Sequence, residues 1–283
     1  MEYDYDLVVI GGGAAGLTSS GIAASLAAKT LMIERERLGG DCTWHGCIPS
    51  KTLLHAAKLA HDARSASEFG VHAGEVTVDF PAVMSKLRAI RQEIYEEADA
   101  PEKFEAMGVE VAKGEASFVN AHTIDIASDN GSRRVTARKV IIAAGGRARV
   151  PDLPGLDEVE HVTNVGLFEM DELPKRLAIL GAGPIGTEMA QAFQRLGSQV
   201  TVVEQGTRIL DHDDEELADL LHASLKGEGI TYRMGTSAER VESIDGGGLR
   251  LLLDSGDPVE ADALLTSVGR IPNVETLNLA AAE

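Results

Sequence analysis

Two cysteines lie close together in the stretch GGDCTWHGCIPSK, residues 39–51, and they are the only cysteines in the 283-residue chain. A disulfide between Cys42 and Cys47 would close too short a loop to act as a structural staple. With His45 they offer three metal ligands, fewer than the four that a structural zinc site needs, and no metal site is expected. A redox-active pair is the favoured interpretation, and inert thiols are the alternative.

The residues after the cysteines favour thiol chemistry. Pro49 suits the first turn of a helix predicted over 48–66, which places both cysteines just before a helix N-terminus. The positive end of a helix lowers the pKa of a thiol, and Lys51 adds a nearby positive charge. We therefore expect one of the two cysteines to be largely thiolate near neutral pH.

A glycine motif occurs twice in the same context. In each copy an apolar run leads into GxGxxG, a helical segment follows, and a second apolar run ends in a glutamate 23 residues after the first glycine. The residues concerned are Gly11, Gly13, Gly16 and Glu34 in the first copy, and Gly181, Gly183, Gly186 and Glu204 in the second. Such glycines allow a tight turn and a close approach of pyrophosphate, and the acid meets the ribose. The repeat predicts two dinucleotide sites.

The predicted fold class is therefore α/β, with two Rossmann-like domains that each have a parallel central sheet and a small antiparallel β-meander. Apolar periodicity predicts helices over 48–66, 80–106 and 213–229. Short apolar runs over 109–144 predict an antiparallel sheet.

Composition excludes several classes of partner. The chain has 26 basic and 45 acidic residues, a formal charge of −19, which disfavours nucleic acid. Residues 7–28 lack charge, but they are rich in Gly, Ala and Ser and follow an acidic flank, so neither a membrane span nor a signal peptide is expected. We expect a cytoplasmic protein. The acidic run 211–216 suits a helix N-terminus better than a metal site.

Glu204 also bears on the choice of nicotinamide cofactor. A carboxylate at this position repels the 2′-phosphate of NADPH, whereas an NADP site uses a nearby arginine. Arg208 lies four residues further on and weakens the argument. NADH is favoured.

The sequence resembles the class I pyridine nucleotide-disulfide oxidoreductases, or flavoprotein disulfide reductases. The family pattern GGxCxxxGCxPSK is present in full at 39–51. VIIAAGGRARVP at 140–151 and ALLTSVGRIPN at 263–273 are further family marks. The nearest groups are the mercuric-reductase-like proteins and dihydrolipoamide dehydrogenase.

The resemblance implies a relay of electrons from NAD(P)H through FAD to the cysteine pair. FAD would lie on the first glycine motif and NAD(P)H on the second, with Gly40, Gly145 and Gly269 as further cofactor-binding residues. Cys47 would be the flavin-proximal cysteine and Cys42 the interchange cysteine. Lys51 would lie beside the flavin, paired with Glu188. The implied domains are FAD-binding 1–150, NAD(P)-binding 151–266 and a return to the first domain over 267–283.

Some residues depart from the usual family pattern. Trp44 and His45 stand where many relatives have Asn and an aliphatic residue, and Ala144 stands where many have Thr. Thr43 and Trp44 together resemble mercuric-reductase-like sequences, which implies a small-molecule disulfide or a thiol-bound Hg(II) as substrate. Glu204 instead resembles the lipoamide enzymes, so dihydrolipoamide dehydrogenase stays an alternative. His45 is a less favoured local base.

The family also has a C-terminal dimerisation domain, and the resemblance therefore implies a full-length homodimer. The sequence given ends at Glu283, before that domain. We expect weak flavin retention and little turnover from this chain alone, and a catalytically incompetent nucleotide-binding fragment is a further alternative.

Overall fold

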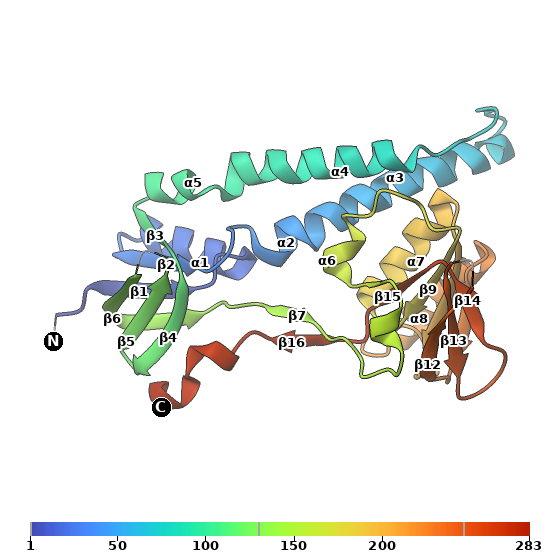
Figure 1. The fold of residues 1–283 in the computed structure, drawn as a ribbon. Coiled ribbons are helices and arrows are strands. Elements are labelled where there is room, and N and C mark those ends of the chain that lie inside the picture. The colour runs from blue at the N-terminus through green and yellow to red at the C-terminus, as the bar shows by residue number, and fades with distance from the viewer. Residues whose placement is uncertain (1, 130, 246) are drawn as a thin grey trace. The chain divides into compact units, whose positions relative to one another are not determined.

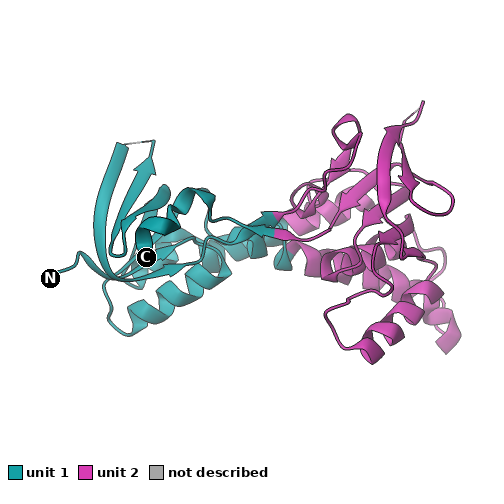
Figure 2. Cartoon of the chain, turned by 90° about the horizontal axis from the view of Figure 1, so that it is seen from below, with its two compact units in different colours: residues 1–48, 89–147, 271–283 teal, residues 49–88, 148–270 magenta. Residues whose placement is uncertain are grey.

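The computed structural model describes residues 2–129, 131–245 and 247–283; Asn130, inside the predicted antiparallel segment, lies outside the described residues. The chain forms two compact units, coloured teal and magenta in Figure 2. The first unit comprises 1–48, 89–147 and 271–283, and the second comprises 49–88 and 148–270. The assignment of these regions to FAD and NAD(P) stays a prediction.

The first unit is built on a six-stranded sheet with the order β3-β2-β1-β6-β5-β4 (Figure 1). Its strands are β1 Tyr5–Ile10, β2 Thr30–Glu34, β3 Val109–Lys113, β4 Glu115–Asn120, β5 Thr123–Ser128 and β6 Gly131–Ile142. β3, β2, β1 and the second half of β6 pair in parallel, while the first half of β6 pairs antiparallel with β5. The antiparallel prediction for 109–144 was therefore wrong for β3, whose Val109 joins the core of the parallel sheet.

Strand alternation sends apolar side chains to both faces of this sheet. One face packs Met32 and Val109 against Leu17 of helix α1, Ala14–Ser25, and Phe104 of helix α5, Pro101–Ala106. The other face of the parallel strands packs against the antiparallel part of the same sheet, formed by β4, β5 and the first half of β6, where Phe118 and other apolar residues are buried. The first glycine motif thus lies on a βαβ unit with both faces of its sheet covered.

The helical region agrees in part with the sequence prediction. Its elements are α2 Gly40–Trp44, α3 Cys47–Ser65, the 3-10 helix η1 Ala66–Phe69, α4 Phe80–Ile94 and the π-helix η2 Tyr95–Asp99. The single helix predicted over 80–106 was wrong, since η2 interrupts it and Ala100 is extended, with φ −62° and ψ 144°. A residue before proline avoids the helical conformation, and Pro101 starts α5.

The second unit repeats the plan with a five-stranded parallel sheet, order β11-β10-β9-β15-β8, and a three-stranded antiparallel sheet, order β12-β13-β14. Its strands are β8 His161–Val162, β9 Arg176–Leu180, β10 Gln199–Glu204, β11 Thr231–Met234, β12 Ala238–Ser243, β13 Leu249–Leu253, β14 Val259–Ala261 and β15 Ala263–Thr266. Its helices are η3 Leu156–Glu158, α6 Asn164–Leu167, α7 Pro184–Leu196 and α8 Glu215–Gly227. Asp214 caps α8 through the backbone N–H of Leu217, close to the predicted start.

Alternation divides the core of the second unit in the same way. Ile179 and Val202 belong to a cluster with Phe193 of α7 and with Leu53 of α3 and Met84 of α4. The neighbouring strand residues Ala178, Leu180 and Val203 instead face the cluster that contains β12, β13 and β14. The α/β fold class with parallel central sheets and added antiparallel strands is confirmed.

The remaining elements lie where the chain passes between the units. β7 Gly146–Ala148 and β16 Arg270–Pro272 form a two-stranded sheet, and η4 Glu275–Leu277 and η5 Leu279–Ala282 follow. Leu277 is buried in the core of the first unit, and Asn278 Nδ2 donates a hydrogen bond to Phe118 O over 2.9 Å. Among the described residues, no helix has the length and apolar character that crossing a membrane requires.

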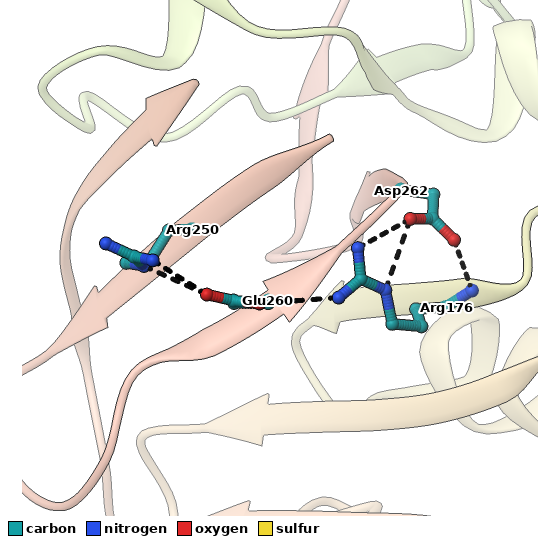
Figure 3. Close-up of polar contacts among 4 residues, drawn as sticks. All are labelled: Arg176, Arg250, Glu260 and Asp262. Atoms are coloured by element: carbon teal, nitrogen blue, oxygen red, sulfur yellow. Dashed lines mark hydrogen bonds and ion pairs between the residues drawn. The ribbon is translucent and has the colours of Figure 1, made fainter. Parts of the chain in front are cut away.

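A charge network joins the parallel and antiparallel sheets of the second unit (Figure 3). Asp262 accepts from Arg176 through the backbone N at 2.8 Å and through Nη2 at 2.7 Å. Glu260 lies 3.4 Å from Arg176 Nη1 and accepts from Arg250 Nη2 at 2.8 Å. Hydrogen bonds from Arg176 hold the pKa of Asp262 below its ordinary value of 3.8.

We predict that Asp262→Asn lowers the free energy of unfolding at pH 7 by about 1 kcal/mol, a value discounted for the partial exposure of the pair. A carboxylate with a lowered pKa stabilises the fold above its unfolded pKa and loses this effect as the pH falls through the folded value. Urea unfolding of both proteins from pH 7 to pH 3 should show the difference shrinking below about pH 4. A difference that stays constant with pH would contradict this role of the charge.

Candidate active site and nucleotide sites

The first glycine motif forms the turn between β1 and α1. Gly11 has φ +107°, a conformation that favours glycine. A Cβ on Gly16 would lie 1.8 Å from the carbonyl oxygen of Gly11, so α1 crosses the turn as closely as backbone allows. Gly13 is the N-cap of α1 and has no side-chain cap, which leaves backbone N–H groups of the first turn for an anion.

Glu34, at the end of β2, holds this turn with both carboxylate oxygens. Oε2 accepts from the backbone N of Gly12 at 2.7 Å, and Oε1 accepts from the backbone N of Glu36 at 2.7 Å. The adjoining cavity is lined by residues of five chain segments, among them Glu34, Arg35, Gly114, Ala144, Asn273 and Thr276. Its volume is only about 60 Å³.

The second glycine motif repeats this geometry between β9 and α7. Gly181 has φ +97°, and a Cβ on Gly186 would lie 2.0 Å from its carbonyl oxygen. No heavy atom lies within 4 Å of the Cβ position of Gly183. Glu204 Oε2 accepts from the backbone N of Ala182 at 2.7 Å, and Oε1 accepts from the backbone N of Gly206 at 2.7 Å. The two motifs are thus equivalent in structure as well as in spacing.

A cavity of about 920 Å³ opens over the second motif, within the usual range for small-molecule sites. Its lining includes Gly183, Glu204, Asp213, Ser267, Gly269 and Arg270. Arg208 bonds to the rim of this cavity: its Nη2 donates to the backbone carbonyls of Asp211 and Asp213, which line it, and its Nη1 lies 3.9 Å from Glu215 Oε2. Its guanidinium is therefore engaged by the segment that leads into α8.

The cysteines lie on two successive helical segments. Cys42 is in α2 and is half-buried, and Cys47 is the exposed first residue of α3. Neither Cys42 nor Cys47 forms a disulfide in this structure. Burial, followed by the adjacent Cys47 side chain, raises the pKa of Cys42 from 9.0 to about 11. For Cys42 the loss of solvent outweighs the backbone N–H of Cys47, so Cys42 is not the thiolate of the pair; that one of the two cysteines is largely ionised stays a prediction.

Backbone contacts join the cysteine segment to the first glycine motif. Gly39 N donates to Gly12 O at 2.9 Å, and Gly39 forms an isolated parallel bridge with Gly13. Gly40 has φ +55°, and a Cβ at this position would lie 2.6 Å from Gly13 Cα. The sequence assigned Gly40 to cofactor binding by resemblance alone. The structure gives a separate reason for glycine there, which is this backbone contact.

The other predicted site residues are divided between the two units. Lys51 Nζ lies 2.8 Å from Glu188 Oε1, which brings together α3 and α7 of the second unit. Gly145 has φ +65° and its carbonyl accepts from Asn273 N at 3.0 Å in the first unit. Gly269 has φ +122° and its carbonyl accepts from Arg149 N at 2.9 Å in the second unit. The roles predicted for these residues stay predictions.

Sequence reasoning missed several residues that contact the cysteine segment. Thr43 and Trp44 are buried, and they contact Arg37, Tyr95 and Asp99. The only available signal was the unusual Trp44, since no spacing rule predicts that a helix fifty residues later packs on it. In the described parts of the chain, no group of three or more His, Cys, Asp or Glu side chains could hold a metal ion.

Comparison with known proteins gives consistent matches. Residues 5–283 match the family model described as pyridine nucleotide-disulphide oxidoreductase. Mercuric reductase from Bacillus cereus is 37% identical over 284 residues, covering 99% of this chain and 44% of that protein. Glutathione reductase from Nostoc sp. is 34% identical over 282 residues, covering 99% and 59%. Mitochondrial dihydrolipoyl dehydrogenase from Pisum sativum is 36% identical over 283 residues, covering 97% and 56%.

A solved structure agrees with the sequence matches. The HOCl-induced flavoprotein disulfide reductase RclA from Escherichia coli superposes with a TM-score of 0.83 at 27% identity, covering 98% of this chain and 59% of that one. The chain spans about half the length of the curated relatives described above. On the family match and these identities, the chain belongs to the pyridine nucleotide-disulphide oxidoreductase family.

Proposed function

We propose that this chain carries the FAD site, the NADH site and the redox-active cysteine pair of a mercuric-reductase-like disulfide oxidoreductase. The observation that carries the proposal is the backbone contact between Gly39-Gly40 and Gly12-Gly13. It connects the segment that holds Cys42 to the turn that would bind the pyrophosphate of FAD. A substitution that moves the backbone of one segment should therefore also displace the other segment.

The residues of the first unit fit a flavin nucleotide. The α1 N-terminus offers backbone N–H groups to the pyrophosphate, and Glu34 lies at the end of β2, where a ribose is bound in such folds. Gly145 leaves an open position, since no heavy atom lies within 4 Å of its Cβ site. The cavity beside Glu34 has a volume of only about 60 Å³. Most of a bound nucleotide would therefore lie outside it, along the backbone N–H groups of the glycine turn. When bound, FAD would accept a hydride from NADH and pass the electron pair on to the cysteines.

The second unit fits NADH better than NADPH. The Glu204 carboxylate lines the large cavity and would repel a 2′-phosphate. Arg208, the residue that could have offset this repulsion, is held by the carbonyls of Asp211 and Asp213. The geometry thus supports the preference that the glutamate predicts.

The cysteines perform the thiol chemistry in this proposal. Reduction of a Cys42–Cys47 disulfide breaks the S–S bond with two electrons and yields two thiols after uptake of two protons. Cys42, once deprotonated, attacks a substrate sulfur to form a mixed disulfide and release one thiolate. Attack by Cys47 on Cys42 then restores the intramolecular disulfide and releases the second thiolate. Because the pKa of Cys42 is raised, removal of its proton is a required step.

Lys51 and Glu188 have a supporting role in this proposal. Their side chains are 63% and 39% exposed, so the ion pair itself adds little to stability. The pair keeps the ammonium of Lys51 on α3 one turn after Cys47, where a fixed positive charge favours electron flow towards a flavin. Its acid partner limits the freedom of the lysine side chain.

The favoured substrates are a small-molecule disulfide and a thiol-bound soft metal ion such as Hg(II), because thiolates are soft ligands. The cited relatives include a mercuric reductase, a glutathione reductase and a dihydrolipoyl dehydrogenase, so both substrate types are represented. We propose a homodimer as the functional full-length form, as in the family. Dihydrolipoamide dehydrogenase activity is the alternative.

The proposal predicts a definite gain of thiols. The oxidised chain, incubated with FAD and then with NADH without oxygen, should gain two titratable thiols per chain, whereas Cys42→Ser and Cys47→Ser should gain none. Retained flavin is measured separately by absorbance, so poor FAD binding is not mistaken for absent electron transfer. Flavin-loaded chain that gains no thiols would contradict the proposal. Adding lipoamide or Hg(II) with excess thiol then shows which acceptor consumes the electrons.

Two glycines of the second motif, Gly183 and Gly186, should respond differently to replacement by alanine. Gly183→Ala meets no atom within 4 Å and should leave the unfolding free energy unchanged, yet it should weaken NADH binding about tenfold or more because it blocks the approach of pyrophosphate. Gly186→Ala must displace the Gly181 carbonyl and should destabilise the fold by about 1–3 kcal/mol. Urea unfolding and NADH titration followed by fluorescence test both. Equal NADH affinity for Gly183→Ala and the parent chain would disprove this site, and tighter binding of NADPH than NADH would disprove the preference.

A further inference from the structure

One face of the π-helix and of the last turn of α4 contacts the cysteine segment. The face consists of Arg91, Tyr95 and Asp99, and Gln92 beside it accepts from Arg37 Nη2 at 3.0 Å. In an α-helix every fourth residue drifts by about 40°, and the wider π-turn removes part of this drift. The Ala100 N–H donates to the Tyr95 carbonyl at 2.8 Å, the spacing of a π-turn. Asp99 therefore stays on the side that carries Arg91 and Tyr95.

Trp44 is held on several sides by this face and by Arg37. The Arg37 guanidinium lies 3.3 Å from the Trp44 ring centroid and 4.4 Å from that of Tyr95, and the two rings are 5.1 Å apart. Arg91 Nη1 donates to Trp44 O at 2.9 Å. Trp44 Nε1 donates to Leu38 O at 2.8 Å. The end of α2 is thus held through the indole ring, its Nε1 and the Trp44 carbonyl.

The neighbouring residue fixes the turn that carries Cys42. Thr43 Oγ1 donates to Asp99 Oδ2 at 2.5 Å, a short bond to a charged acceptor. Thr43 is 4% exposed, so little water competes for this hydrogen bond. A Cβ on Gly39 would lie 3.0 Å from Asp99 Oδ2 and 2.8 Å from Thr43 Cβ, which shows how closely the carboxylate packs on the turn.

Two titratable groups of the first unit act on the Cys42 thiol from outside its own turn. Cys47 acts from the start of α3, through its side chain and its backbone N–H, and Asp99 acts from η2 as a negative charge. Asp41 and His45 flank Cys42 on its own segment, and the guanidinium groups of Arg37 and Arg91 lie against Trp44. Asp99 is therefore the acid that η2 adds beside the thiol.

We propose that Asp99 is a positioning residue for the proposed interchange cysteine: its hydrogen bond to Thr43 holds the turn that carries Cys42, and its carboxylate, packed against that turn, adds a negative charge that disfavours a Cys42 thiolate. This inference rests on the proposed division of labour between Cys42 and Cys47. It assigns to the π-helix a part in the chemistry that no sequence motif indicates.

The test is the pH dependence of Cys42 alkylation in the reduced 283-residue chain without added cofactor. Iodoacetamide labelling is followed by tandem mass spectrometry, which separates Cys42 from Cys47 within one peptide. Asp99→Asn keeps an acceptor for Thr43 and removes the charge, so labelling of Cys42 at pH 8 should be about threefold faster, equivalent to a midpoint lower by about 0.5. Glu97→Gln removes an equal charge from an exposed position of the same π-helix and should match the parent chain.

Thr43→Val tests the hydrogen bond separately, because it leaves the charge in place. The equilibrium constant for forming the Cys42–Cys47 disulfide against glutathione should fall at least severalfold, while thermal unfolding confirms that the variant is folded. Unchanged alkylation in Asp99→Asn, or an equal acceleration in Glu97→Gln, would overturn the charge role, and an unchanged disulfide equilibrium in Thr43→Val would overturn the positioning role. Neither readout needs FAD or NADH, so failure here is distinct from failure of the proposed electron transfer.

Discussion

The structure of the first unit depends on a close backbone contact between the glycine turn after β1 and the segment that carries Cys42. Gly39 and Gly40 both have positive φ, and the Cβ position of Gly40 is 2.6 Å from Gly13 Cα. Side chains would separate the two segments at this point. Glycine therefore serves two purposes here, since the contact that requires it also joins the turn proposed to bind FAD to the segment of the proposed redox-active cysteines.

The glutamate that recurs in both motifs, predicted to bind a ribose, also has a structural role. Glu34 and Glu204 each bond to two backbone N–H groups with two carboxylate oxygens at 2.7 Å. Each acid thus holds its glycine turn through both carboxylate oxygens. A carboxylate has further lone pairs, so the same acid could also accept the ribose hydroxyls of the proposed nucleotide while it keeps these backbone bonds. The same contacts in both units explain why the spacing of 23 residues recurs.

Sequence reasoning was strongest where spacing is local. The two βαβ units, the α/β class and the acid at the end of each second strand follow from glycine spacing and apolar runs, and the structure contains them. Prediction from the sequence failed where contacts between distant segments determine the secondary structure. The helix predicted over 80–106 is broken at Pro101, and β3 joins the parallel sheet. Asp99 was missed because its contact with Thr43 joins distant segments through a π-turn that no residue pattern marks. Arg37 was missed because no spacing rule predicts that its guanidinium stacks on Trp44.

The most direct test of the coupling between the two segments is Gly40→Ala, with Gly74→Ala as control. Gly74 has a similar positive φ of +75° but no heavy atom within 4 Å of its Cβ position, so the control carries the backbone strain without the clash. FAD affinity and the glutathione equilibrium of the Cys42–Cys47 disulfide are measured on each chain. The account predicts that Gly40→Ala weakens both and that Gly74→Ala weakens neither. Loss of one property with full retention of the other would contradict it.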